Sequence, residues 1–311
     1  MRVIRFTLVG LFALMLFAGS AEAEMVHALT SGHVRTFTGN FLGADQSEQL
    51  FHDEGKTHAV AGESVSSSFG GATAVASGWG RSWINPLTEL LSLQAAASQA
   101  TSPATGEAPV VPASGYARGG ASWLDAIYVP KVQDVLLTFQ VTAELSASGS
   151  GEGWISAQSG PNTADLFIQS DGNVSVYGWD SYSWDALTGN FSGLVTFRRP
   201  ISRIEIDDQE WGYGEIELGL LTEASTNTGA MLAGGSSRVE SLNSMTLIRI
   251  AYADSGLPPE IEGGSVRFES GLISPNVIPE PSSLVLAVFG GFGLLGWRLG
   301  RRRGLGGPRG A

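Results

Sequence analysis

Residues 201–207 read Ile-Ser-Arg-Ile-Glu-Ile-Asp, so that Ile204 and Ile206 share one side of an extended chain while Glu205 and Asp207 share the other. Side chains alternate between two faces along a strand, and this pattern therefore predicts a half-buried antiparallel β-strand. Similar short runs recur between clusters of Gly, Asn, Asp and Ser at 34–42, 135–145, 165–169, 174–179, 193–198, 215–221, 246–252 and 265–269. We expect an all-β body with a β-sandwich or jelly-roll-like fold.

One segment departs from this strand pattern. Asn85 and Pro86 are typical of a helix start, and the leucines that follow, with residues 94–97, fit a helix of about three turns. The sequence therefore predicts one short helix within the all-β body.

Two stretches read as connections. Residues 98–114 hold Pro103, Pro109 and Pro112 among Ala, Ser and Thr, which predicts a linker or a long surface loop. Residues 143–153 are rich in Gly and Ser and are interpreted as a flexible turn. Residues 24–97 offer few strand candidates for a separate core. We therefore expect residues 24–277 to form one body with an insertion.

The C-terminal region begins with Ile278-Pro279-Glu280-Pro281, in which each proline fixes its own φ and keeps the preceding residue extended. An uncharged run follows at 284–297. As a helix, residues 282–299 would be about 27 Å long, enough for a thin bilayer. Basic residues close this segment: Arg298, Arg301, Arg302 and Arg303. They predict that residues 304–311 form a cytoplasmic tail.

The N-terminal region predicts export as well. Arg2 and Arg5 precede an apolar run at 6–19, and Ala21 and Ala23 supply small residues where a signal peptidase reads them. We expect a signal peptide over residues 1–23 with cleavage after Ala23. An uncleaved anchor helix is the alternative, and it would export the body equally.

The C-terminal features resemble the tripartite sorting signal of PEP-CTERM proteins, through Pro279, Glu280, Pro281, the apolar segment and the arginines. This resemblance covers residues 278–303 and the N-terminal signal, and it does not extend to the body. In that family the tail is processed by a membrane-embedded exosortase. The enzyme occurs in Gram-negative bacteria that make extracellular polysaccharide. The resemblance implies export across the inner membrane, transient anchoring by residues 282–299 and delivery to the cell surface or the extracellular space.

Composition limits what the body can bind. Residues 24–276 carry 28 acidic and 11 basic residues, a net charge of −17, once Glu22, Glu280 and the seven terminal arginines are left out of the totals of 30 and 18. Nucleic acid is an unfavourable partner for such a surface. The chain has no cysteine, which excludes disulfides and thiolate chemistry.

Catalytic motifs are sparse. The four histidines, His27, His33, His52 and His58, do not have the spacing of a zinc site. His52-Asp53-Glu54 with His58 could bind a metal, but a polar loop explains these residues better. Carboxylate pairs for glycoside hydrolysis could come from Asp180 with Asp185, or from Asp207, Asp208 and Glu210. Calcium held by Asp171 and Asn173, or by Asp207 and Asp208, is an alternative use of such residues. The sequence predicts no cofactor.

The best binding candidates are aromatic: Tyr177, Trp179, Tyr182 and Trp184. Aromatic faces stack on sugar rings, but a two-residue turn at Asp171-Gly172 would pair Leu166 with Tyr177 and Phe167 with Val176, which makes both hairpin faces largely apolar. Core packing and an exposed sugar platform therefore both remain open, with Trp184 expected to be the most exposed member. Trp211 and Tyr213 present a weaker version of the same choice.

Two classes of function are consistent with these features. One is a non-enzymatic surface or extracellular-matrix protein whose β-sandwich binds polysaccharide or partner proteins. The other is a secreted carbohydrate-active enzyme that uses a carboxylate pair. Because no catalytic motif was found, we favour the first.

Overall fold

The computed structural model of the protein describes residues 27–276, apart from 41, 85–90, 105–109, 170, 207, 228–230, 262, 263 and 273. The predicted signal peptide with Ala21 and Ala23, the motif Pro279 to Pro281, the apolar segment and its flanking arginines lie outside these residues. Within the described part of the chain, we find no helix with the length and apolar character that crossing a membrane requires.

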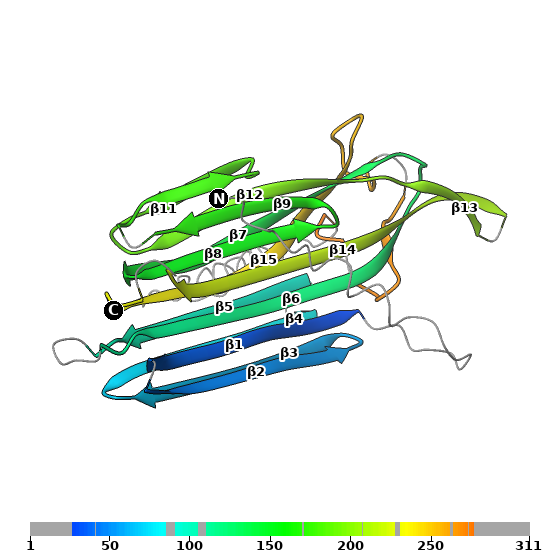
Figure 1. Ribbon diagram of the computed structural model, residues 1–311. Coiled ribbons are helices and arrows are strands. Elements are labelled where there is room, and N and C mark those ends of the chain that lie inside the picture. The colour runs from blue at the N-terminus through cyan, green and yellow to red at the C-terminus, as the bar shows by residue number, and fades with distance from the viewer. Residues whose placement is uncertain are drawn as a thin grey trace, which may run out of the picture.

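The described residues form two antiparallel sheets that lie face to face (Figure 1). Sheet A has the order β10-β9-β8-β14-β6-β1-β2, with β13 paired to β14 and β16 to β6, and sheet B has the order β11-β12-β7-β15-β5-β4-β3. The strands of sheet A are β1 (Ala28–Asn40), β2 (Gly43–Gly55), β6 (Ala113–Val129), β8 (Gly151–Ser159), β9 (Asn162–Ile168), β10 (Val174–Tyr177), β13 (Ser202–Ile206), β14 (Gln209–Thr226) and β16 (Arg267–Phe268). Those of sheet B are β3 (His58–Phe69), β4 (Ala72–Ile84), β5 (Leu91–Ser102), β7 (Val135–Gly149), β11 (Ser181–Asp185), β12 (Asn190–Arg199) and β15 (Gly235–Tyr252).

The all-β prediction is confirmed, and the two packed antiparallel sheets are consistent with a β-sandwich. In β13, Ile204 and Ile206 are half-buried while Glu205 is exposed, as the alternation of residues 201–207 predicts. The strand extends sheet A at one end of the molecule, where Figure 1 shows it projecting beyond the other strands.

The predicted helix is wrong where the structure describes it. Leu91–Ser102 is strand β5, which pairs with β4 on one side and β15 on the other. At every second position the side chain is at most 2% exposed (Leu91, Leu93, Ala95 and Ala97), and the residues between them are more exposed, which is the period of a strand. Alanine favours a helix only weakly, and two neighbouring strands override that preference.

The connections are shorter than predicted. Within residues 98–114, the first five belong to β5 and the last two to β6, while Ala104 and Val111 exchange backbone hydrogen bonds of 3.0 and 3.1 Å. Residues 143–153 lie mostly in β7 and β8, with only Ser150 between those strands. Each of the two sheets contains strands that precede residues 98–114 and strands that follow them, so this segment does not divide the strands into two separate sets.

The size of the core side chains differs between the two ends of the strand order in the sheets. Around β7, β12 and β14 it consists of large side chains such as Phe139, Phe197 and Leu218. Around β4, β5 and β6 the inward residues are mostly alanine and glycine. A Cβ added at Gly80 would lie 2.0 Å from the carbonyl oxygen of Gly120, and one at Gly119 would lie 2.2 Å from that of Trp79. Here the two sheets touch backbone to backbone.

Candidate ligand-binding face

The four predicted aromatic residues divide into two exposed and two half-buried side chains. Tyr177 and Tyr182 are 62% and 56% exposed. Trp179 and Trp184 pack against the main core cluster, so Trp184 is not the most exposed member, contrary to the prediction. The reason is register: Trp184 lies opposite the buried Phe191, and both therefore point between the sheets.

Trp179 joins the two sheets at one edge. Its Nε1 donates to the Asp165 carbonyl oxygen in sheet A at 3.1 Å, and its ring meets Phe191 of sheet B edge-on at 4.9 Å. A Cβ at Gly193 would lie 2.5 Å from the indole, which shows how closely the ring is enclosed. Trp179 is therefore a packing residue, and of the predicted cluster only the tyrosines remain available to a ligand.

The hairpin that carries Tyr177 has a register one position away from the predicted one. Val176 pairs with Leu166, because residues 169–173 form a wider loop in which Gln169 N donates to Asn173 O and Gly172 N donates to Gln169 O, both at 3.0 Å. Leu166 and Val176 consequently point into the core, while Phe167 and Tyr177 point outward.

This register creates an exposed row of rings on the outer face of sheet A. Trp154 of β8 stacks on Phe167 of β9 with ring centroids 5.8 Å apart, and Phe167 meets Tyr177 of β10 edge-on at 6.4 Å. Phe167 is 38% exposed. The indole Nε1 of Trp154 donates to Asp165 Oδ1 at 3.2 Å, which fixes one end of the row. We call Trp154, Phe167 and Tyr177 the aromatic row.

Sequence reasoning missed Trp154 and Phe167. Trp154 adjoins the stretch interpreted as a turn, and Phe167 was paired in the wrong register. A usable signal was present in Gly160-Pro161: Ser159 pairs with Asn162 around these two residues, and continuing that ladder places Trp154 opposite Phe167. Gly160 has a φ of +57°, which suits glycine at such a turn.

Polar groups continue the row across the same face. Glu223 of β14 lies opposite Trp154, and Arg118 of β6 lies opposite Glu223. The Tyr116 hydroxyl donates to Glu223 Oε2 at 3.2 Å. Burial raises the pKa of the Glu223 carboxyl above its usual value, and burial together with Glu223 raises the pKa of Tyr116 to about 12. His33, which pairs with Glu48 at 2.6 Å, borders this group.

The first predicted carboxylate pair, Asp180 and Asp185, is not arranged as a catalytic pair. Asp185 accepts from Leu187 N and Thr188 Oγ1 at 3.0 and 2.8 Å, and these bonds lower its pKa. Asp180 directly precedes β11 and Asp185 is its last residue, so five residue steps separate them, a backbone distance of about 16 Å. This exceeds the roughly 5 to 9.5 Å between the carboxyls of glycosidase pairs.

The remaining acidic residues are used in turns and ion pairs. Glu210 is paired with Arg203 at 2.8 Å, and Asp208 sits in the β13–β14 turn with a φ of +59°. Asp171 accepts from Asn173 N at 2.9 Å, so these two residues close a turn. Asp207 lies outside the described residues. In the part of the chain that the structure covers, no group of three or more His, Asp or Glu is arranged to hold a metal ion.

The other predicted candidates are placed as follows. Asp53 accepts from Val60 N of β3 at 2.8 Å, while the exposed His52 and Glu54 lie 3.6 Å apart on the other side of β2. Trp211 and Tyr213 are half-buried, with the Arg267 guanidinium 4.8 Å from the centre of the Trp211 ring. Neither set forms a defined site.

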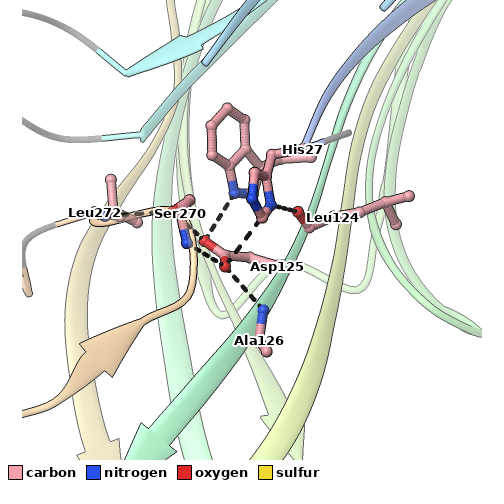
Figure 2. A network of polar contacts seen from close by, with 7 residues as sticks. His27, Leu124, Asp125, Ala126, Ser270 and Leu272 are labelled. Atoms are coloured by element: carbon pink, nitrogen blue, oxygen red, sulfur yellow. Dashed lines mark hydrogen bonds and ion pairs between the residues drawn. The ribbon is translucent and has the colours of Figure 1, made fainter. Parts of the chain in front are cut away.

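A Ser-His-Asp group, in which the histidine and the aspartate are buried, lies elsewhere, near the end of β6 (Figure 2). Asp125 accepts from Trp123 Nε1 at 3.1 Å, Ala126 N at 2.8 Å, and both the backbone N–H and the hydroxyl of Ser270 at 3.1 and 2.5 Å. His27 Nδ1 lies 2.7 Å from the Leu124 carbonyl oxygen. Because a carbonyl oxygen can only accept a hydrogen bond, Nδ1 is the donor.

These bonds differ from those of a hydrolase triad. In a triad the serine hydroxyl bonds to the imidazole, whereas here it donates directly to the carboxylate. The group instead ties the beginning of the described chain and its C-terminal segment to β6, and we interpret it as structural.

Comparison with protein-family models, with curated proteins and with solved structures gave no match to this chain.

Proposed function

We propose that this protein is an exported surface or extracellular-matrix component, sorted by a PEP-CTERM-type signal, whose non-catalytic β-sandwich binds polysaccharide through the outer face of sheet A. In this proposal an exosortase of a Gram-negative bacterium recognises Pro279, Glu280 and Pro281, and residues 282–299 anchor the chain transiently in the inner membrane.

The aromatic row is the observation that carries the binding proposal. Three ring side chains from three neighbouring strands share one face, and Tyr177 and Phe167 are substantially exposed. Exposed rings offer apolar faces and edges to a sugar, and the adjacent Glu223 and Arg118 supply groups that can hold its hydroxyls. A row that crosses strands suits an extended polymer better than a small enclosed ligand.

The ends of the body support the sorting proposal. His27, four positions after the predicted cleavage site, is buried and its backbone N–H donates to Gly55 O at 3.2 Å. At the other end, Asn276 Nδ2 donates to Ile250 O at 2.8 Å. The described residues thus begin four positions after Ala23 and end three positions before Pro279, and hydrogen bonds hold both of these ends to the sheets.

The alternative is a carbohydrate-active enzyme. Its best candidate acid is Glu223, whose raised pKa is a property of general acids. A glycosidase also needs a second carboxylate across the substrate, and the groups that interact with Glu223 are Tyr116 and Arg118. This arrangement favours binding over hydrolysis.

A glycan array probed with the full-length protein in detergent tests the binding proposal. The double variant Phe167→Ala/Tyr177→Ala should bind the retained polysaccharide at least about tenfold more weakly, a loss of about 1.4 kcal/mol. Tyr182→Ala is the matched control, since this tyrosine is similarly exposed but lies on β11 of sheet B. Unchanged binding by the double variant would contradict the proposed face, and turnover abolished by Glu223→Gln would favour the enzyme.

The sorting proposal is tested in cells that contain an exosortase. Glu280→Ala should leave the protein in the membrane fraction at its unprocessed mass. Glu269→Ala is the control, because it removes an exposed carboxylate from the end of the body and leaves the motif intact. Unaltered mass and localisation of the Glu280→Ala variant would show that residues 279–281 are not the signal.

A further inference from the structure

The geometry points to a second glycan site on the outer face of sheet B: a trough above β5, between Trp79 of β4 and the Arg238–Glu240 ion pair of β15. Because it lies on the opposite face from the aromatic row, the protein would join two glycan chains. The ligand class rests on the proposed function, whereas the trough itself is an independent feature of the structure.

The trough follows from strand register. One cross-strand row reads Trp79, Ala96, Glu240, and a parallel row reads Ser77, Ser98, Arg238. In each row the residue of β5, Ala96 or Ser98, is small, and at least one of its two neighbours has a larger side chain. These six side chains and Ala97 line a groove of about 300 Å³.

The floor of the trough is rigid, because sheet A supports it from below. A Cβ at Gly119 of β6 would lie only 2.4 Å from the Ala96 carbonyl oxygen, and one at Gly78 only 2.7 Å from that of Arg118. With backbone packed on backbone, β5 cannot sink or tilt without moving the other sheet. A preformed groove loses little free energy in ordering itself around a ligand.

The chemistry of the trough suits a neutral sugar. Trp79 contributes an apolar wall, and the hydroxyls of Ser77 and Ser98, 2.8 Å apart, lie along the floor. Arg238, whose side chain is 56% exposed, and Glu240 offer donors and acceptors side by side, as neighbouring sugar hydroxyls require.

Charge and size define the ligand further. A polyanion would compete with Glu240 for Arg238 and would meet a body of net charge −17. The volume is at the lower limit for small-molecule pockets. One or two rings of a neutral chain that crosses the sheet therefore fit better than an acidic polymer or a large enclosed molecule.

Titration calorimetry of the full-length protein in detergent with cellohexaose, xylohexaose and mannohexaose tests this inference. We expect two sites per chain for at least one hexasaccharide. The Trp79→Ala variant should lose one of these two sites, and Arg238→Ala replaces it if Trp79→Ala folds poorly. Ser98→Phe should block the same site by filling the groove. Trp83→Ala is the control, since Arg81 covers that ring at 4.2 Å from its centre.

The outcomes separate the two sites. Loss of one site in the Trp79→Ala variant and of the other site in the Phe167→Ala/Tyr177→Ala variant supports both sites. In that case the wild type, but neither variant, should raise the viscosity of a solution of the corresponding polymer. A single site that ignores Trp79→Ala overturns the trough and leaves the proposed function standing. A single site lost in Trp79→Ala supports the trough and overturns the aromatic row. If no hexasaccharide binds, the trough is overturned, and a glycan array that is also negative overturns both.

Discussion

Gly80→Ala is expected to destabilise the protein more than its size suggests. Gly80 lies on the inner face of β4, where a Cβ would stand 2.0 Å from the carbonyl oxygen of Gly120 in the opposite sheet. Real Cβ atoms are almost never closer than 3.0 Å to such an atom, so at least 1.0 Å of movement is required. Both contacting groups are backbone, and no side chain can rotate to make room.

The cost follows from this geometry. Overpacking a core typically costs about 1 to 3 kcal/mol, and movement of one sheet against the other belongs at the upper end of that range. Alanine is intrinsically better than glycine in a strand by about 0.5 to 1 kcal/mol, which offsets part of the loss. We expect a net loss of about 2 kcal/mol, a large fraction of the roughly 5 to 15 kcal/mol that stabilises a protein.

Urea denaturation followed by tryptophan fluorescence measures the effect. With a slope of about 2 to 3 kcal/mol per molar urea, the midpoint should fall by roughly 0.7 to 1 M. Gly219→Ala is the matched control, because Gly219 lies in β14 with its nearest prospective neighbour 3.7 Å away. That variant should be neutral or slightly more stable. A Gly80→Ala midpoint equal to that of Gly219→Ala would refute the close contact between the sheets.

Three further results are expected from the same assay or from titration. Trp179→Ala should cost about 3 kcal/mol, because it removes the ring that joins the sheets at one edge, and equal stability to wild type would contradict that role. Glu223 has a raised pKa in the folded state, so its contribution to stability is present below its unfolded value of 4.5 and is lost as the pH rises through the folded pKa. Relative to Glu223→Gln, the wild type should therefore lose stability as the pH rises above 4.5, and parallel profiles would contradict the burial of this carboxyl. Tyrosinate absorbance should show a step near pH 12 that Tyr116→Phe removes.

The strand content could be predicted because alternation is a local signal. Ile204 and Ile206 determine the inward face of β13 without reference to any other strand, and the structure agrees. The failure at residues 91–97 has the opposite origin. Ala96 pairs with Trp79 on one side and with Glu240 on the other, and the second of these partners lies far along the chain. A run of leucine and alanine does not reveal such a neighbour.

The binding face shows the same limit. Tyr177 was a candidate because it belongs to a cluster of aromatic residues in the sequence, but whether it faces solvent depends on a register that differs by one residue from the predicted one. A shift of one residue exchanges the two faces of a strand. The contacts of Gly80 and Gly119 could not be predicted either. The sequence shows only that glycine is abundant, whereas the close approach is between strands of different sheets.

We expect the glycine contact to couple the two proposed sites. Gly119 lies beside Arg118, which continues the polar group next to the aromatic row, and its prospective Cβ would press on the carbonyl oxygens of Trp79 and Ala96, at 2.2 and 2.4 Å, beneath the trough. Gly119→Ala should therefore weaken glycan binding on both faces at once, whereas Trp79→Ala affects one. A Gly119→Ala variant that folds and binds normally on both faces would show that the spacing of the sheets does not position either site. If binding falls on both faces together, the small residues of β4, β5 and β6 set the fixed distance at which two glycan chains are held.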